Sequence, residues 1–303
     1  MLATPLESTT THTPAHGDVT IQYLGTAGWL LRSGSAALLI DPYVSRINGP
    51  PPPGAAPYSE SGDARPVYKW DDTAVADKAA IDEHLAAADV ILVTHTHYDH
   101  VLDVPYTALK TRAAVIGTES TQNVMRAYDV PERQLLTVRG GEDYEFDSFS
   151  VRVIPSLHSA LDHKHYFSSA TAPAGLKAPL TLRQIHPEGG TLAFLVRFAG
   201  MQLLAFGSMN YVEREIDGLR PDIVIAGAGQ SRHEVYQYTK RLMGLLAFPP
   251  IVFPTHWDNF LAPYGASQRA ALESLHAFVH EVSVAAPRTR VIVPRYFQTV
   301  SCA

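Results

Sequence analysis

Short apolar runs separated by glycine-rich turns open the chain. The runs over 19–23, 29–32 and 36–40 are divided by the sequences GTAG and SGSA. Apolar runs of this length between such turns are typical of strands joined as a meander. Asp41-Pro42 ends the third run, and a polar segment rich in proline and glycine follows it. The pattern therefore predicts three strands and then a surface loop.

A wholly apolar segment over 89–93 (DVILV) predicts a buried strand, and apolar residues at helical spacing predict a helix over 74–88 before it. The rest of the pattern predicts strands over 114–116, 144–146, 150–154, 191–198, 201–206, 222–226, 251–254 and 290–293, and helices over 120–128, 235–246 and 267–282. The strands thus come in two batches, and helices follow each batch.

This order of elements predicts an α/β fold in which two sheets pack together with helices outside, a four-layer αββα sandwich. No linker rich in glycine and serine divides the chain. We therefore expect one domain over 18–303, after a polar N-terminal tail over 1–17.

The strongest chemical signal follows directly after the strand over 89–93. His95, His97, Asp99 and His100 place four ligand-type side chains within six residues. Imidazole nitrogens and carboxylate oxygens suit Zn²⁺ and neighbouring transition metals. In extended geometry the first two point to one side, whereas the last two turn away in the following loop. The arrangement favours two adjacent metals over one, and a surface cluster of histidines without metal is the alternative.

These four residues match, position by position, the HxHxDH signature of the metallo-β-lactamase superfamily, which the chain therefore resembles. The opening sequence YLGTAGWLLRSGSAALLIDPY is similar to the branch that contains L-ascorbate-6-phosphate lactonase. Later motifs of that branch resemble 155–158 (PSLH) and 253–257 (FPTHW). The resemblance implies the four-layer fold and a hydrolase activity.

The resemblance also implies two adjacent metal sites with three protein ligands each, namely His95, His97 and His158 for the first and Asp99, His100 and His256 for the second. One or two zinc ions are expected, with manganese or iron as alternatives. Asp99 is expected to orient the nucleophile as well as to bind metal. Asp41 is expected to hydrogen-bond a ligand or to stiffen its loop.

The chain departs from the superfamily pattern at one position. Most members carry a bridging aspartate after a strand, in a Gly-Asp pair, and here Ser208 follows Gly207. A hydroxyl is a weak ligand, so the second metal is expected to bind weakly or to be bridged by hydroxide alone. Asn210 and Asp258 are candidates for a replacement ligand, although no spacing singles them out.

Three further side chains have two interpretations each. His163 and His165 follow His158 by five and seven residues, in a stretch that would cover the site. Each is either a surface residue or a contact for the substrate. Trp257 flanks His256 and either packs in the core or forms a pocket wall.

Composition narrows the class of partner. Lys and Arg number 24 against 30 Asp and Glu, a net charge of −6, which disfavours nucleic acid as a partner. The apolar stretches are too short to span a membrane. The start of the chain has no signal-peptide pattern, so we expect a cytoplasmic protein, although a signal removed by processing would leave no trace. A homo-oligomer is compatible with the sequence.

Together these features predict a metal-dependent hydrolase that uses a metal-activated hydroxide. The expected partner is a small-molecule substrate with a lactone, ester or phosphate group, whose identity depends on the segments over 44–72 and 159–190. Two other functions stay open. One is a phosphodiesterase acting on phospholipid or nucleic acid, and the other is a metal-binding protein without turnover, motivated by Ser208.

Overall fold

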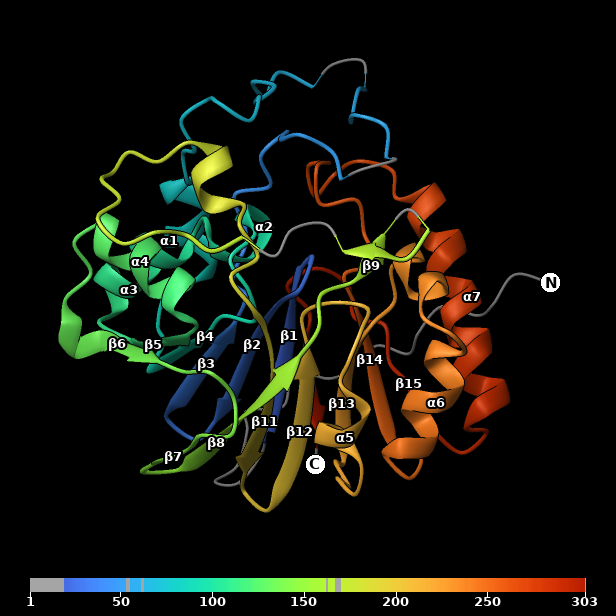
Figure 1. The fold of residues 1–303 in the computed structure, drawn as a ribbon. Coiled ribbons are helices and arrows are strands. Elements are labelled where there is room, and N and C mark those ends of the chain that lie inside the picture. Colours follow the sequence, from blue (N-terminus) through green and yellow to red (C-terminus); the bar gives the residue numbers. More distant parts are fainter. Residues whose placement is uncertain (1–18, 53–54, 61–62, 162, 167–169, 303) are drawn as a thin grey trace.

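Two seven-stranded sheets lie face to face, with helices on the outer side of each (Figure 1). The computed structural model describes residues 19–302, apart from 53–54, 61–62, 162 and 167–169. The tail expected over 1–17 therefore lies outside the described residues. The predicted four-layer αββα sandwich is confirmed.

The first sheet combines an antiparallel half with a parallel half. Strands β16, β1, β2 and β3 pair antiparallel, and β3, β4, β5 and β6 pair parallel. In spatial order the strands are β16 (Thr299–Cys302), β1 (Val19–Gly25), β2 (Gly28–Ser33), β3 (Ala36–Ile40), β4 (Val90–Leu92), β5 (Ala114–Gly117) and β6 (Leu135–Thr137). The meander predicted at the start of the chain is thus present.

The second sheet has the same mixed character. Strands β7, β8, β11 and β12 pair antiparallel, and β12, β13, β14 and β15 pair parallel. In spatial order the strands are β15 (Arg290–Val291), β14 (Ile251–Thr255), β13 (Ile223–Gly227), β12 (Met201–Phe206), β11 (Thr191–Phe198), β8 (Phe149–Ser156) and β7 (Asp143–Phe146). A short ribbon of β9 (Ala160–Leu161) and β10 (His165–Tyr166) follows β8.

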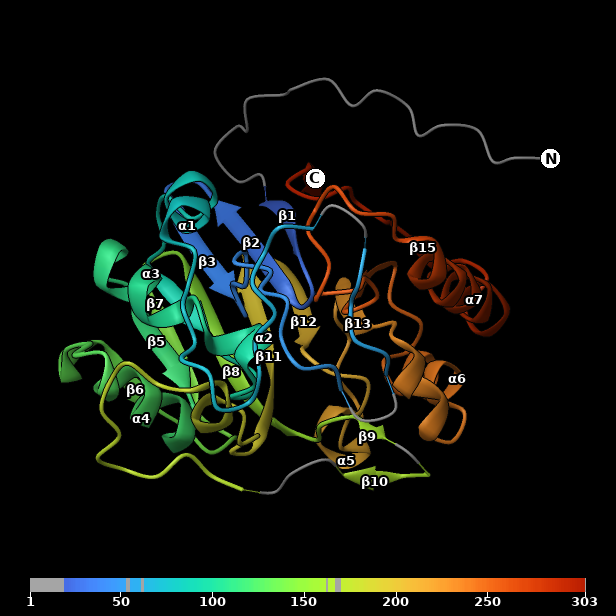
Figure 2. The ribbon, with the colours of Figure 1, turned by 90° about the horizontal axis from the view of Figure 1, so that it is seen from above.

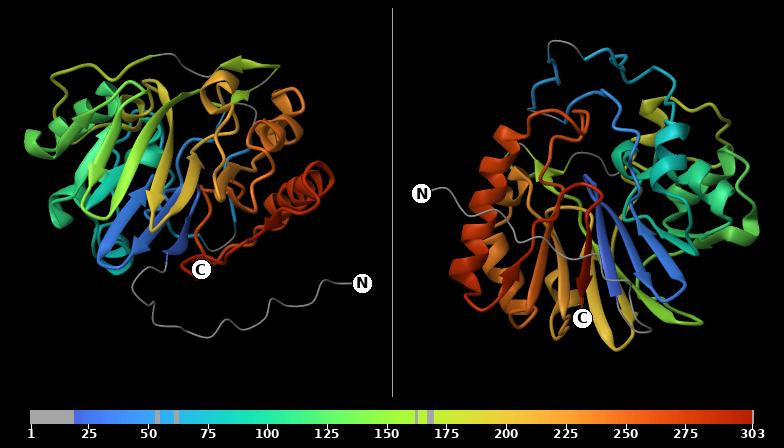
Figure 3. Two further views of the ribbon diagram at one scale, coloured as in Figure 1. Left: turned by 90° about the horizontal axis from the view of Figure 1, so that it is seen from below. Right: turned by 180° about the vertical axis from the view of Figure 1, so that it is seen from behind.

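Helices cover the two outer faces. Those before β6 lie on the first sheet, and the last two lie on the second (Figures 2 and 3). The α-helices are α1 (Lys78–His84), α2 (Tyr98–Val101), α3 (Val104–Thr111), α4 (Glu119–Ala127), α5 (Glu213–Ile216), α6 (Tyr238–Leu245) and α7 (Arg269–Ala285). Short 3-10 turns are η1 (Glu132–Gln134), η2 (Leu182–Ile185) and η3 (Gln230–Glu234). Among the described residues, no helix has the length and apolarity needed to cross a membrane.

Successive residues of a strand point to opposite sides. Because both faces of the first sheet are buried, its strands carry apolar residues at successive positions. Leu30 and Leu39 pack under the helices, whereas Trp29 and Leu38 pack between the sheets. The indole N–H of Trp29 donates to Thr255 Oγ1 of the second sheet at 2.9 Å. This alternation fixes how the two sheets lie against each other.

The sequence pattern misjudged the extent of the first helix and missed one edge strand. The helix expected over 74–88 begins only at Lys78, because the Asp77 side chain accepts hydrogen bonds from the N–H groups of Ala79 and Ala80 and caps it there. Ala74 lies in extended backbone, where its N–H donates to Leu180 O. The sequence pattern also missed β16, which pairs with β1 at the edge of the first sheet.

Strands from both sheets end at one shared edge. β3 and β4 run parallel in the first sheet. In the second sheet β8 and β12 each pair antiparallel with β11, and β12, β13 and β14 pair parallel, so β8, β12 and β14 point the same way. The residues that follow these five strands include every candidate singled out by sequence motifs. Open α/β sheets place their functional sites at such an edge.

Candidate metal centre

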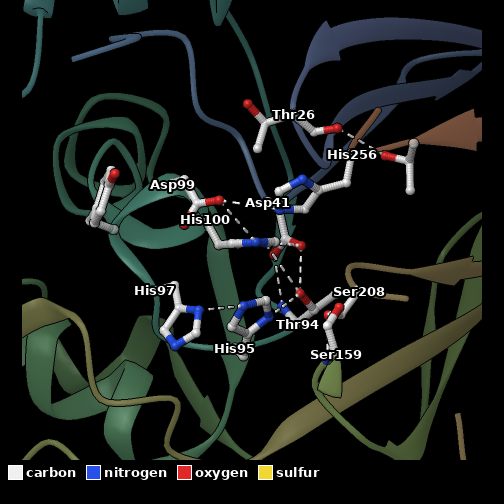
Figure 4. Close-up of polar contacts among 12 residues, drawn as sticks. Thr26, Asp41, Thr94, His95, His97, Asp99, His100, Ser159, Ser208 and His256 are labelled. Atoms are coloured by element: carbon white, nitrogen blue, oxygen red, sulfur yellow. Dashed lines mark hydrogen bonds and ion pairs between the residues drawn. The ribbon is translucent and has the colours of Figure 1, made fainter. Parts of the chain in front are cut away.

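Six histidine and aspartate side chains come together at this edge, and all of them except His158 are labelled in Figure 4. They form two groups, and within each group the nitrogen or oxygen atoms that would face a cation lie within 4.8 Å of one another. The first group is His95, His97 and His158, and the second is Asp99, His100 and His256. The structure therefore assembles the same two sets that the resemblance implied.

The segment after β4 supplies four of the six side chains. His97 has an extended backbone, and its ring lies close to that of His95, with His95 Nε2 3.2 Å from His97 Nδ1. Asp99 and His100 lie in the one-turn helix α2, where a loop was expected. The buried Tyr98 side chain anchors this turn, since its hydroxyl donates to Pro50 O at 2.9 Å. The turn directs Asp99 and His100 to the second group.

His256 follows β14 in a left-handed backbone conformation, with φ of 52°. This conformation is uncommon for a residue with a side chain, so neighbouring contacts must hold it. The His256 N–H donates to Thr26 O at 2.6 Å. Two residues later, the Asp258 carboxylate accepts hydrogen bonds from Arg46, at 2.5 Å, and from the hydroxyls of Tyr23 and Tyr296.

In two histidines, one ring nitrogen is engaged in a hydrogen bond with the protein, and the other ring nitrogen faces the site. Nδ1 of His158 lies 3.0 Å from the backbone oxygen of Ser159, and Nδ1 of His100 lies 2.8 Å from Asp41 Oδ2. Only a protonated Nδ1 can donate in these contacts, so the lone pair is on Nε2. A histidine fixed in this way is prepared to bind a cation through Nε2.

Asp41 sits behind the second group and accepts three hydrogen bonds. Besides His100, its carboxylate accepts from the N–H of Thr94 at 2.7 Å and from the Thr94 hydroxyl at 2.5 Å. Gly207 packs against the same atoms, and a Cβ there would lie 2.0 Å from Thr94 Oγ1. The expected hydrogen bond from Asp41 to a candidate ligand is therefore present, and only glycine fits at 207.

Burial and neighbouring charge set the protonation of the site. Burial lowers the pKa values of His95 and His97 well below the ordinary value, and lowers that of His158 to about 4. Burial opposes ionisation of Asp99, yet His100 and His256 outweigh it and lower the pKa of this carboxyl. Neutral imidazoles and an ionised carboxylate are the forms that bind metals.

At His100 the neighbouring carboxylates outweigh burial and favour the protonated imidazole. Burial disfavours its charged form, but Asp41 and Asp99 raise the pKa of the imidazole above its ordinary value. Protons would therefore compete with a cation for its Nε2. The mixed nitrogen and oxygen donor set, largely buried and with the tautomers of His100 and His158 fixed, fits a transition metal such as zinc, manganese or iron.

Ser208 follows β12 and makes its hydrogen bonds with Ser159. Its Oγ accepts from the Ser159 N–H at 2.9 Å and lies 2.7 Å from Ser159 Oγ. Met209 N in turn donates to Ser159 Oγ at 3.0 Å. The position that carries a carboxylate in the superfamily pattern is thus occupied by a neutral pair of hydroxyls.

Neither candidate replacement for the missing carboxylate lies free at the site. The Asp258 carboxylate is engaged by Arg46 and two tyrosines, as described above. Asn210 donates from Nδ2 to His158 O and to the Tyr166 hydroxyl, and its Oδ1 accepts from the Tyr211 N–H. Asp258 and Asn210 therefore support the loops that carry His256 and His158.

The remaining candidates lie outside the pocket beside the two groups. Trp257 packs against the rings of Tyr23 and Tyr296 at the border of the core. His163 and His165 are exposed in the ribbon of β9 and β10 and do not line the pocket. Of the two interpretations for each residue, the geometry favours the core for Trp257 and the surface for both histidines.

The sequence pattern missed His186, a partly buried residue of the segment without a period. Its ring stacks on His97, with centroids 4.4 Å apart and planes 13° apart, and also contacts Trp70 at 4.3 Å. Burial lowers its pKa to about 4. No motif surrounds His186, so only the fold brings it to the site.

A family model and one curated relative match most of the chain. A model described as a β-lactamase superfamily domain matches residues 20–256. A UPF0173 metal-dependent hydrolase of Archaeoglobus fulgidus is 26% identical over 247 residues, which cover 79% of this chain and 84% of the relative.

Solved structures share the fold at low sequence identity. Igni18, a metallo hydrolase of Ignicoccus hospitalis, superposes with a TM-score of 0.57 at 15% identity and covers 94% of this chain and 99% of its own. CmlA, a diiron β-hydroxylase of Streptomyces venezuelae, gives a TM-score of 0.56 at 14% identity over 96% of this chain and 55% of its own. Both likenesses concern the fold alone.

Proposed function

The chain belongs to the β-lactamase superfamily, and from that premise we propose that it is a metal-dependent hydrolase of a small molecule with a lactone, ester or phosphate group. The observation that carries the proposal is the pair of groups His95, His97, His158 and Asp99, His100, His256 at the edge of one pocket. The metal-dependent hydrolases among its relatives support the same activity. Similarity to the ascorbate-phosphate lactonase branch remains a prediction.

The six side chains would hold one or two metal ions, zinc first, with manganese or iron as alternatives. A divalent ion bound there supplies a Lewis acid that polarises the scissile group and makes water acidic enough to react near neutral pH. The chain's own residues prepare this chemistry by keeping His95, His97 and His158 neutral and Asp99 ionised.

Asp99 is the candidate for the catalytic carboxylate. It is the one carboxylate among the described side chains that line the pocket. Its Oδ2 lies 3.2 Å from His256 Nε2 and 3.6 Å from His100 Nε2, so histidines fix its orientation. An oxygen of Asp99 can therefore accept a hydrogen bond from the attacking water and orient it. In ester hydrolysis the acyl C–O bond breaks, the water oxygen joins the acyl carbon, and the leaving oxygen takes up a proton.

Ser208 favours a second candidate, a metal-binding protein without turnover. The hydroxyl pair of Ser208 and Ser159 brings no negative charge between the two groups. Two cations held close together repel each other, and a carboxylate between them offsets that repulsion. Without one, the second group would hold its ion weakly. A phosphodiesterase acting on nucleic acid is disfavoured by the net charge of −6.

Metal analysis of the purified protein, followed by assays with defined metals, tests the proposal. We expect bound transition metal, and a rise in melting temperature on adding Zn²⁺ or Mn²⁺, because a ligand of the folded state stabilises it by mass action. Lactones, phosphodiesters and β-lactams then separate the activities. A protein without metal, with a melting temperature that neither ion changes, would rule the proposal out. Bound metal without turnover of any substrate would favour the second candidate.

A further inference from the structure

A chain of aromatic rings joins the two ligand groups along one side of the pocket. His186 stacks on His97, and Trp70 lies against His186. Tyr98 lies 6.5 Å from Trp70 and 6.1 Å from Phe260, both in edge-to-face geometry. Phe260 reaches the second group, 5.6 Å from His256. We call Trp70, Tyr98, His186 and Phe260 the aromatic wall, and all four line the pocket.

Most of the remaining lining from the loops is apolar. Residues 50–52, all prolines, come from the long loop after β3, and Leu161 comes from β9. Met209 follows β12. The two segments on which substrate identity was expected to depend, 44–72 and 159–190, therefore supply prolines, an indole, a leucine, an imidazole and one hydroxyl, that of Ser159.

Positive charge is missing from this surface. No lysine or arginine is among the described residues that line the pocket. Two arginines lie nearby in the chain, but their guanidinium groups are engaged in the protein interior. Arg46 pairs with Asp258 at 2.5 Å, and Arg232, beside the pocket residue Ser231, pairs with Glu281 at 2.8 Å. A phosphate or carboxylate held by this wall would lack a cationic side chain as its partner.

The size of the pocket favours a compact group over a bulky one. Its volume is about 110 Å³, compared with roughly 150 Å³ for an apolar protein cavity that binds benzene. Edge-to-face and stacked contacts with aromatic side chains favour a flat, uncharged group.

We propose that the aromatic wall selects an uncharged ester or lactone that carries an aromatic or similarly compact apolar group, and disfavours phosphate-bearing substrates. This inference rests on the proposed hydrolase function, which allows lactone, ester and phosphate substrates alike. It assigns Trp70 and Phe260 as specificity-determining residues, since both belong to the wall, neither belongs to the two ligand groups, and neither is fully buried as Tyr98 is.

Three acetate esters test the inference on the metal-loaded protein: methyl acetate, benzyl acetate and 4-phosphonobenzyl acetate. Methanol and benzyl alcohol are similar leaving groups, so the first pair compares binding of the ring. We expect kcat/KM for benzyl acetate to exceed that for each of the other two by about tenfold or more. Binding in an unproductive orientation, for example of the phosphonate on metal, does not change kcat/KM.

A pair of variants tests whether the aromatic wall causes the preference for benzyl acetate. Trp70→Leu should lower kcat/KM for benzyl acetate by about tenfold and leave methyl acetate nearly unchanged. Tyr106→Leu is the matched control, because Tyr106 is also a half-buried aromatic but packs under α1, away from the pocket. Binding of 4-phenylbutan-2-one, an isostere of benzyl acetate that cannot be hydrolysed, gives a second readout by calorimetry and should weaken only in Trp70→Leu.

The two proposals fail in different ways. Equal kcat/KM for all three esters, or a preference for the phosphonate, would overturn the wall's selectivity while leaving the hydrolase intact. Ketone binding that is unaffected by Trp70→Leu would overturn it as well. Tight ketone binding that depends on Trp70, with no hydrolysis of any ester in the presence of zinc, manganese or iron, would support the wall and count against the hydrolase.

Discussion

Asp41 accepts a hydrogen bond from Nδ1 of His100 across 2.8 Å, although 59 positions separate the two residues in the chain. Asp41 has a left-handed backbone, with φ of 42°, and its side chain is fully buried. Such a conformation persists only where surrounding contacts hold it. The hydrogen bonds from Thr94 and His100 supply that support, so the end of β3 and the histidine cluster after β4 form one unit.

Replacing Asp41 by Asn should weaken metal binding without unfolding the protein. An amide presents an N–H₂ group where the carboxylate now accepts from Thr94 or from His100, so His100 loses its fixed orientation. The loss of such a partner typically costs about 10–100-fold in metal affinity. Competition with a chelator measures the affinity. Asp89→Asn is the matched control, because that carboxylate accepts from the Ala37 N–H at the opposite end of β4. Equal affinity in Asp41→Asn and Asp89→Asn would contradict the role of Asp41.

Asp99→Ala should abolish hydrolysis and leave the fold intact. The change removes a candidate ligand and the group proposed to orient the attacking water, but the strands that carry the site stay packed. Groups of this kind typically contribute several kcal/mol of transition-state stabilisation, about 10²-fold or more in rate. Circular dichroism checks the fold, and kcat/KM checks the rate. Near-normal turnover in a folded Asp99→Ala protein would refute the mechanism.

The buried pair of Arg46 and Asp258 should contribute to stability through the loop that carries His256. The Arg46 side chain is 3% exposed and that of Asp258 0%. Asp258→Ala leaves a buried guanidinium without its carboxylate, which typically lowers the free energy of unfolding by about 3–5 kcal/mol. Denaturant titration measures the loss. Asp71→Ala, which removes the exposed partner of Arg183, should give no measurable change. A similar result for both variants would show that the buried pair adds nothing.

Asp103 should make stability depend on pH. Burial raises the pKa of its carboxyl to about 6, although Val44 N, Ser45 N and Ser45 Oγ donate to it. The folded state therefore keeps the proton to a higher pH than the unfolded state, whose carboxyl titrates at about 3.9. As pH rises from about 4 to about 6, this residue's contribution to the free energy of unfolding should fall by about 3 kcal/mol. Asp103→Asn should lack that part of the pH dependence. Parallel stability curves for the two proteins would contradict the assignment.

The sequence predicted the features that depend on local pattern. Short apolar runs and helical spacing identified both halves of the sandwich, because both sheets bury their strands on two faces. The resemblance could group the candidate ligands, which are His95, His97, Asp99, His100, His158 and His256. Each of them follows a strand that ends at the same edge of the two sheets. The fold was thus predictable at the level of layers, and the candidate ligands at the level of residues.

Other features depend on contacts between distant segments and leave no local pattern. His186 lies in a stretch without a period, and it reaches His97 only because η2 packs beside α2. β16 is four residues long and gains its place by pairing with β1, at the other end of the chain. Asp258 was a candidate for a replacement ligand, but the buried Arg46, 212 positions away in the chain, engages its carboxylate.

The substitution Ser208→Asp tests the consequence of the missing carboxylate. We expect the unmodified protein to hold fewer than two metal ions per chain, because a neutral hydroxyl offsets little of the repulsion between two cations. An aspartate at 208 would meet the Ser159 N–H and hydroxyl, which now bond to Ser208 Oγ, so donors for a carboxylate are already in place. Metal titration of both proteins should show a tighter second site in the variant.

Ser231→Asp is the control for Ser208→Asp, since it adds a carboxylate to the same pocket at a position that does not follow β12. It should leave the second site unchanged, because charge alone, without the position at the end of β12, does not place an oxygen between the two groups. Activity distinguishes two further cases. If hydroxide already bridges the metals, the new carboxylate would crowd the nucleophile and lower turnover. Two tightly bound metals in the unmodified protein, with no gain on Ser208→Asp, would mean that a serine at this position is compatible with a complete dinuclear centre.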